Sequence, residues 1–335
     1  MKYTWFILAG LAACSPPVAP EQQALLDVKT FIQSNLDELA AASAALQAAA
    51  PTPDADGWNA SADAAAVASM KAEWKRARTA YEHVEGAIAV LFPDLDVSTD
   101  ARYDDFISTD SDANLFDDHG ATGIHSIERI LWSDSIPARV LTFESGLPNY
   151  VAAAFPKNLA EATDFKTKLC ARLVTDVGTM RSQFAPLALD ASAAYRGVIG
   201  SINEQVEKAN LAATGQEESR YAQYTLADMR TNVGAGQLTY QAFQPWLKQK
   251  GGATLDTQIS AGFARLQAAY GALSGDALPP VPSTWSATPS SADLATPFGM
   301  LYQAIAAEAD AMRPGSLVQV MNQSADLMAI PQLPQ

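Results

Sequence analysis

The sequence is short of positive charge, and this shortage excludes one class of partner. Its 22 lysines and arginines are outnumbered by 37 aspartates and glutamates, which gives a formal net charge of -15. A surface of this sign repels the phosphate backbone of nucleic acids, so we expect no nucleic-acid partner. Runs of valine and isoleucine are sparse whereas alanine is abundant, and this composition favours helices over strands.

Cysteine is also scarce, since Cys14 and Cys170 are the only two. Residues 1–13 carry one lysine followed by an apolar run, which is the layout of a secretory signal peptide. The stretch "LAAC" resembles a bacterial lipobox, so we predict that Cys14 is a lipid anchor and residues 14–22 a tether. An ordinary signal peptide with a coincidental cysteine is the alternative. Cys170 then has no disulfide partner, and its apolar neighbours at helical spacing predict a small buried hydrophobe.

Helical periodicity recurs along the rest of the chain. In residues 22–50 the apolar side chains return at steps of three and four. We expect further helices in the segments 61–92, just after 120, 149–183, 189–212, 216–250, 254–274 and 292–312. No stretch alternates as a strand would, and none after the signal is apolar enough to span a membrane. The sequence therefore predicts an all-α fold of two packed helix bundles with about four helices each, covering residues 23–185 and 186–335.

One short motif carries candidate metal ligands. The stretch "ATGIHSIERILW" places Gly123, His125 and Glu128 in the spacing Gly-x-His-x-x-Glu. Positions i and i+3 share a helix face, so the imidazole and the carboxylate can converge, and the glycine lets another element approach closely. Such a pair suits a transition metal. Two ligands do not make a site, however, and a half-buried polar pair is the alternative.

A second pair of acidic residues strengthens the prediction of a metal site. Glu82 and Glu85 are also three residues apart, and Glu85 shares an apolar stripe with Tyr81 and Ile88. A carboxylate on an apolar face is costly unless it is paired or binds a metal, and bundle metal sites are built from such inward glutamates and histidines. Ion pairs with arginine are the alternative, and the candidate partners are Arg78 and Arg102. Further oxygens could come from the acidic loop, at Asp94, Asp96, Asp100, Asp104 and Asp105.

These motifs, in this order, resemble those of the imelysin family, and in particular its EfeO-type iron-uptake lipoproteins. The residues that match the family's motifs are Tyr81, Glu82, Glu85, Asp100, Arg102, Gly123, His125, Glu128, Tyr221 and Asp228. The chain departs from the family in its second half, where Gln223 stands for a histidine and Thr225 for an aspartate. This departure predicts a weaker or altered contribution of the second bundle to the site.

The resemblance implies a two-bundle fold with a site near the bundle interface, in a periplasmic protein of iron acquisition held at the membrane by its lipid. It implies that His125, Glu128, Glu82, Glu85 and Asp100 are metal ligands. The ion is expected to be iron, with zinc, manganese and calcium as alternatives. An iron permease or a peroxidase in the membrane system is the expected protein partner. The chain is similar to the short form of these lipoproteins, without a cupredoxin-like domain.

Two other functions are alternatives to metal binding. The imelysin name carries a peptidase label, but a helical zinc peptidase of the inverted type needs a histidine where this chain has Arg129. A polysaccharide receptor with a structural ion could use tryptophans for stacking, and the candidates are Trp58, Trp132, Trp246 and Trp285. We prefer the metal-binding protein, because carboxylates with a single histidine make an oxygen-rich site that suits iron.

Overall fold

The structure is a computed structural model that describes residues 18–333, and within them it contains helices and no strand. The elements are α1 (Pro20–Ala49), α2 (Ala64–Glu82), α3 (Glu85–Leu91), α4 (Pro93–Asp100), α5 (Tyr103–Ile107), α6 (Gly123–Leu131), α7 (Ala138–Glu144), α8 (Leu159–Asp164), the π-helical turn η1 (Phe165–Leu169), α9 (Cys170–Phe184), α10 (Ala191–Thr214), α11 (Thr225–Gln249), α12 (Ala253–Gly271), α13 (Ser291–Leu294), α14 (Pro297–Ala309) and α15 (Leu317–Leu327). The all-α prediction is confirmed.

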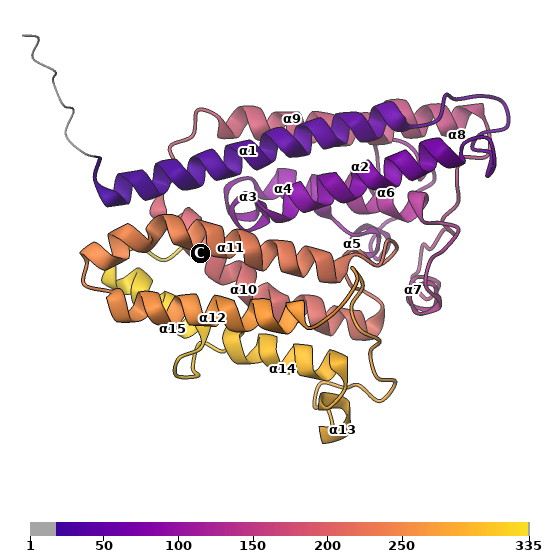
Figure 1. Cartoon of the computed structure of the whole chain (residues 1–335). Coiled ribbons are helices and arrows are strands. Elements are labelled where there is room, and N and C mark those ends of the chain that lie inside the picture. The colour runs from indigo at the N-terminus through magenta and orange to yellow at the C-terminus, as the bar shows by residue number, and fades with distance from the viewer. Residues whose placement is uncertain (1–17, 334–335) are drawn as a thin grey trace, which may run out of the picture.

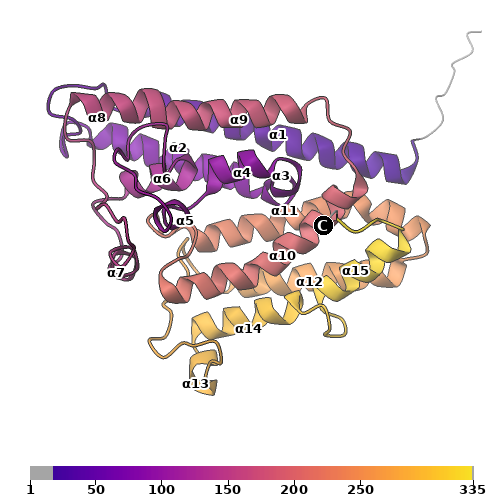
Figure 2. The same cartoon turned by 180° about the vertical axis from the view of Figure 1, so that it is seen from behind.

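The helices form two layers that follow the order of the chain (Figures 1 and 2). The first layer holds α1, α2 and α9 with the short helices α3 to α6, and the second holds α10, α11, α12, α14 and α15. Helix α1 packs on α2 and α9, and it also contacts α11 of the second layer. The chain passes from one layer to the other between α9 and α10, where the sequence predicts the domain boundary. That each layer folds as a separate domain stays a prediction.

The acidic segment after α2 differs from its sequence-based prediction. The helix expected over 61–92 is interrupted at His83 and Val84, so that α2 ends and α3 begins there. The break turns α3 toward α10, where Gly86 and Gly197 come so close that a Cβ on Gly197 would overlap the Gly86 carbonyl oxygen. Residues 93–120, predicted as irregular, contain the short helices α4 and α5.

Other helix ends also differ from prediction, for local reasons. The helix expected from residue 149 begins at Leu159, where the Asn158 side chain caps it by accepting a hydrogen bond from the backbone of Glu161. The helix expected over 216–250 begins only at Thr225, because turns precede it. The predicted 292–312 helix is divided into α13 and α14, and Pro297 starts the second piece. Helix α15 and the short helices exceed the predicted four per half.

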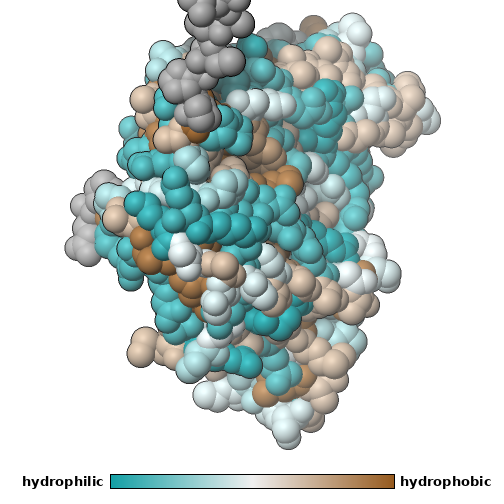
Figure 3. Space-filling view, turned by 60° about the vertical axis from the view of Figure 1, so that its left-hand side comes forward, coloured by the Kyte–Doolittle hydropathy of each residue, from teal (hydrophilic) through white to brown (hydrophobic). Residues whose placement is uncertain are grey.

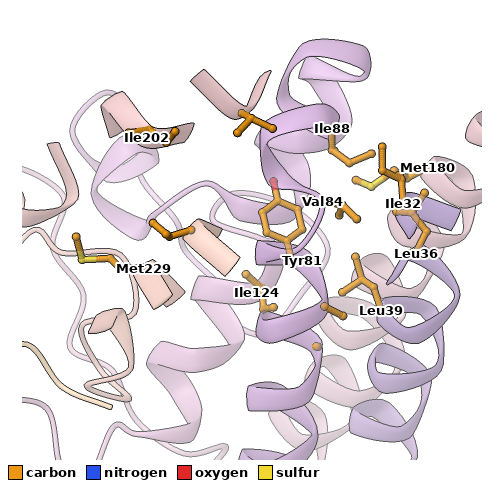
Figure 4. Close-up of a cluster of buried hydrophobic side chains, with 14 of the residues drawn as sticks. Ile32, Leu36, Leu39, Tyr81, Val84, Ile88, Ile124, Met180, Ile202 and Met229 are labelled. Carbon is orange, nitrogen blue, oxygen red and sulfur yellow. The ribbon is translucent and has the colours of Figure 1, made fainter. Parts of the chain in front are cut away.

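One apolar core joins the two layers. Figure 4 shows it as a cluster in which side chains from the first layer, such as Leu36 and Ile124, lie in the same group as Ile202 of α10 and Met229 of α11. Cys170 is fully buried in this core, and burial raises the pKa of its thiol far above the ordinary value, as suits an inert hydrophobe. The surface carries mainly hydrophilic residues on the face seen in Figure 3, with a few small apolar patches.

The ends of the chain bear on the anchoring prediction. Cys14 and the predicted signal peptide, 1–13, lie outside the described residues. Helix α1 begins at Pro20, inside the segment 14–22 that was expected to be a tether. None of the helices within residues 18–333 has both the length and the apolar character required to cross a bilayer.

Trp74 connects α2 and α6, the two helices that carry the sequence motifs. It is fully buried in α2, and its indole Nε1 donates a hydrogen bond of 2.8 Å to the backbone oxygen of Ile124 in α6. Trp74→Phe is expected to lower the free energy of unfolding by about 1–2 kcal/mol, because a buried hydrogen bond and some packing are lost. Urea unfolding measures this change. Trp285→Phe is the control, since Trp285 is half-buried against Phe298 and Tyr302, and equal losses in both variants would contradict a special role for Trp74.

Candidate functional site

The junction of α2 and α3 places two glutamates in the interior. Glu82 is the last residue of α2 and Glu85 the first of α3, and their residues are 1% and 8% exposed. Both carboxylates accept hydrogen bonds from the Asn232 amide of α11, at 3.1 Å for Glu82 and 2.6 Å for Glu85. Glu82 also pairs with Arg78, one turn earlier on α2. The arginine pair expected as the alternative at Glu85 is therefore found at Glu82 instead, whereas Glu85 pairs with Lys208 and Arg102 with Asp105.

A third glutamate and a lysine complete this group. The Lys208 ammonium of α10 lies 2.9 Å from Glu218, 3.0 Å from Glu85 and 3.5 Å from Glu82, measured to the carboxylate oxygens. Burial alone would lower the pKa of Lys208, but the three carboxylates outweigh it and hold the pKa well above the ordinary value. One oxygen from each glutamate lies within 4.8 Å of the others, close enough to bind a single cation. We call Glu82, Glu85 and Glu218 the carboxylate triad.

Arg78 is the second buried cation of the site. It has no exposed surface, and it pairs with Asp100 of α4, with Glu218 at 2.9 Å and with Asp228 of α11 at 3.4 Å, besides Glu82. Burial raises the pKa of Asp228 to about 7, although Arg78 acts in the opposite direction. Asp228 has one buried carboxylate oxygen without a hydrogen-bond partner among the described residues. Arg78 thus connects α2 with α4, with the segment before α11 and with the start of α11.

His125 and Glu128 are bonded to each other. The imidazole Nδ1 lies 2.8 Å from one oxygen of Glu128, and the other oxygen accepts hydrogen bonds from the backbone of Tyr221 and Ala222 at 2.9 Å and 2.8 Å. The imidazole Nε2 lies 3.3 Å from Asp100. Burial would lower the pKa of His125, but the carboxylates of Asp100 and Glu128 together outweigh it and raise the pKa to about 9. The imidazole therefore reaches the triad only through Asp100 and Arg78, and Glu128 faces the segment before α11.

Gly123 and Tyr81 position α4 beside these groups. Gly123 has a φ of +85°, and a Cβ at this position would overlap the backbone oxygen of Thr99, which precedes Asp100. The close approach expected at this glycine is therefore made by the end of α4. The Tyr81 hydroxyl also contacts α4, since it donates to the carboxylate of Asp96. Both contacts fix where the Asp100 carboxylate lies.

A cavity of about 380 Å³ lies beside the triad and is strongly acidic. Burial raises the pKa of Glu85, which lines this cavity, and the neighbouring Glu82 raises it further. Arg102 and Lys208 are the basic residues of the lining. The acidic residues of the lining are Glu85, Asp96, Asp100, Asp105, Glu204, Glu207 and Glu218. Glu207 and Asp105 are exposed, so the cavity reaches the protein surface.

Arg129 and Tyr221 belong to a separate buried network. The Arg129 guanidinium lies 3.1 Å from Glu144 of α7 and 3.7 Å above the ring of Tyr103, and the Tyr221 hydroxyl donates to the same Glu144. Neither residue lines the cavity. Gln223, which replaces the family histidine, bonds to Glu217 at 2.9 Å and is also absent from the lining. These residues stabilise the segment before α11, from which Glu218 projects.

The sequence interpretation missed Lys208 and Glu218. Both had a signal: Lys208 shares a helix face with the buried Gln205 and Ala212, and a charge on such a face needs partners, as at Glu85. Glu218 lies next to the recognised second-half motif. A second acidic group, Asp117, Asp118 and His119, also has cation-binding spacing but is largely solvated, and the His119 side chain is 85% exposed.

Comparisons with known proteins bear on this site. A family model described as imelysin, and named as a peptidase family, matches residues 32–312. Proteins named "iron uptake system component EfeO" from Escherichia coli K12, Shigella flexneri and Shigella sonnei are each 28% identical to this chain over 200 residues. The match covers 60% of this chain and 43% of each relative, so the chain spans less than half the length of these relatives.

Proposed function

This chain belongs to the imelysin family, and from that membership we propose that it is a metal-binding protein of an iron-uptake system. The names of its EfeO relatives support the role in iron uptake. The observation that carries the proposal is the carboxylate triad, in which two buried glutamates of the α2–α3 junction meet the partly buried Glu218 beside an acidic cavity open to the surface. The cation is the substrate, taken up at the cavity and passed on.

The chemistry of the triad suits iron. Carboxylate oxygens are hard ligands, and Glu82, Glu85 and Glu218 each bring one of them within 4.8 Å of the others. Asp100 is near enough to join them through the small rearrangement of a side chain, because it shares Arg78 with Glu82 and Glu218. Zinc, manganese and calcium compete for such oxygens, so we propose that iron is selected by supply as well as by the site.

In this proposal His125 and Glu128 do not bind the metal ion directly. Glu128 holds the imidazole and the backbone of residues 221 and 222 at once. The imidazole Nε2 in turn lies 3.3 Å from Asp100, close enough for a protonated imidazole to attract that carboxylate. We propose that the Gly-x-His-x-x-Glu motif positions the metal-binding carboxylates, as groups behind metal ligands commonly do.

The residues do not support a peptidase or a polysaccharide receptor. A zinc peptidase of the inverted type needs a second imidazole at position 129, but Arg129 is engaged by Glu144 and Tyr103. The tryptophans that could stack on sugars pack instead on other aromatic rings of the protein. These contacts are Trp58 with Phe165, Trp132 with Trp74, Trp246 with Phe243 and Trp285 with Phe298.

We propose further that the protein works at the periplasmic face of a bacterial membrane, anchored through Cys14, and delivers the ion to an iron permease or a peroxidase. The lipobox-like stretch before Cys14 supports the anchor. Mass spectrometry of the mature N-terminus tests it, because a lipidated Cys14 adds the mass of its acyl chains. An unmodified cysteine would contradict the anchoring.

Metal binding is tested by removing the charge of single triad members. We expect Glu85→Gln and Glu218→Gln each to weaken binding of Fe²⁺ and Mn²⁺ by about 10–100-fold, since each removes an anionic ligand. Calorimetric titration under anaerobic conditions measures the affinity. The control is Asp117→Asn combined with Asp118→Asn, which neutralises the exposed acidic group and should leave the affinity unchanged. Equal affinities in wild type and both triad variants would overturn the assignment.

A further inference from the structure

Lys208 occupies the place in the triad where a metal ion would bind. Its ammonium contacts all three carboxylates at 2.9 to 3.5 Å, and its side chain is only 3% exposed. Within residues 18–333 its hydrogen-bond and ion-pair partners are these three glutamates. The ammonium therefore already supplies the positive charge that the triad needs.

We propose that Lys208 is a tethered counter-cation that exchanges with the incoming metal ion, leaving the triad when the ion binds and returning when it is released. This inference rests on the proposed function, because it concerns the same site. A metal ion bound to carboxylates lies roughly 2.0–2.6 Å from their oxygens. Since the ammonium already touches oxygens of all three glutamates, an ion at their centre would meet it at close range, and like charges repel.

The structure also provides a place for the displaced ammonium. Glu204 lies one turn before Lys208 on α10, at the i−4 position, and both residues line the acidic cavity. Side chains at this spacing are neighbours on a helix and form ion pairs readily. The cavity, at about 380 Å³, has room for the four-carbon stem to rotate. Lys208 can thus leave the triad without leaving carboxylate partners.

Exchange has a consequence for delivery. The ion must displace an attached competitor, so the wild-type site binds more weakly than the same triad without the lysine. On release the ammonium returns to the triad, so that its carboxylates keep a cationic partner besides Arg78. Such a site gives up its ion to a partner more easily than a rigid cage of carboxylates would.

The first test compares Lys208→Met with wild type in a titration with Mn²⁺ alone. Methionine has a similar length and no charge, so we expect binding at least about tenfold tighter. Lys208→Arg retains the charge and should show no tightening. Lys248→Met is the matched control, because Lys248 lies at the C-terminal end of α11, pairs with Asp256 rather than with the triad, and is 52% exposed. If the wild type binds Mn²⁺ and Lys208→Met binds it equally or more weakly, the exchange is overturned and the proposed function is left intact. If neither protein binds Mn²⁺, both are overturned.

A second test uses the wild-type chain, so that it does not depend on whether the variant folds. Acetylation of lysines by acetic anhydride, read by mass spectrometry, should leave Lys208 protected without metal and label it several-fold more at saturating Mn²⁺. Lys248 should react equally in both conditions. Protection of Lys208 that persists in the saturated protein would overturn the exchange.

Glu204 gives the third test, a double-mutant cycle. Glu204→Gln should weaken Mn²⁺ binding in the wild-type background, because the displaced ammonium loses its partner, and should have no such effect in Lys208→Met. Equal weakening in both backgrounds would show that Glu204 acts on the ion directly, and this would contradict the proposed resting place.

Discussion

Replacing Arg78 by methionine is expected to lower the free energy of unfolding by about 3–5 kcal/mol. The guanidinium is fully buried and contacts four carboxylates, those of Glu82, Asp100, Glu218 and Asp228. Without it these groups remain in the interior with less positive charge than they need, and burial of unpaired charge is the costliest result of breaking such a network. Urea unfolding measures the loss.

The neighbouring Arg76 is the matched control. It lies two residues earlier on α2 and forms ion pairs with Glu38 and Glu73, but its side chain is 41% exposed. Arg76→Met should therefore change the free energy of unfolding by less than about 1 kcal/mol. We also expect Mn²⁺ to restore part of the stability of Arg78→Met, since a bound cation supplies positive charge to the same carboxylates. Similar losses in the two variants would show that the Arg78 network contributes no more than a surface pair.

Gly123→Ala is expected to lower the free energy of unfolding by on the order of 3 kcal/mol, because two effects add at this position. The backbone of Gly123 has a φ of +85°, which an alanine adopts only under strain. Its Cβ would also overlap the Thr99 carbonyl oxygen at the end of α4. Thermal and urea unfolding both report the loss.

Gly123→Ala should also weaken metal binding. Thr99 precedes Asp100, so an α4 that moves away from α6 carries the Asp100 carboxylate away from Arg78 and His125. We expect Mn²⁺ binding to weaken by about tenfold, as for other changes behind a ligand. Gly178→Ala is the control: this glycine is exposed on α9 with nothing near its missing Cβ, so alanine should stabilise by about 0.5–1 kcal/mol. An unchanged Mn²⁺ affinity in Gly123→Ala would show that the Gly-x-His-x-x-Glu motif does not position the metal-binding carboxylates.

The effects expected for Arg78→Met and Gly123→Ala have the same structural cause. The candidate ligands come from the α2–α3 junction, from α4 and from the segment before α11, and the last of these lies more than a hundred residues from the other two. Arg78 connects them by charge, and Gly123 lets α4 and α6 come into contact. A substitution of Arg78 or of Gly123 is therefore expected to change the free energy of unfolding and the metal affinity together.

What the sequence by itself determined follows from short-range patterns. The spacing of apolar residues predicts the long helices, because a helix face repeats every three to four residues. The same reasoning marks Glu85 as a charge that needs a partner and Gly123 as a point of close approach, since each depends on its own helix. Burial of Cys170 follows in the same way.

Only the tertiary structure decided which groups meet. Periodicity shows that a side chain faces inward, but not what it faces, so the pairing of Glu85 with Lys208 and of Glu128 with the backbone of Tyr221 was beyond its reach. The break between α2 and α3 was missed for the same reason, because it is fixed by the packing of α3 on α10. Interactions between residues more than a hundred positions apart depend on how the two layers dock, and local sequence does not encode that docking.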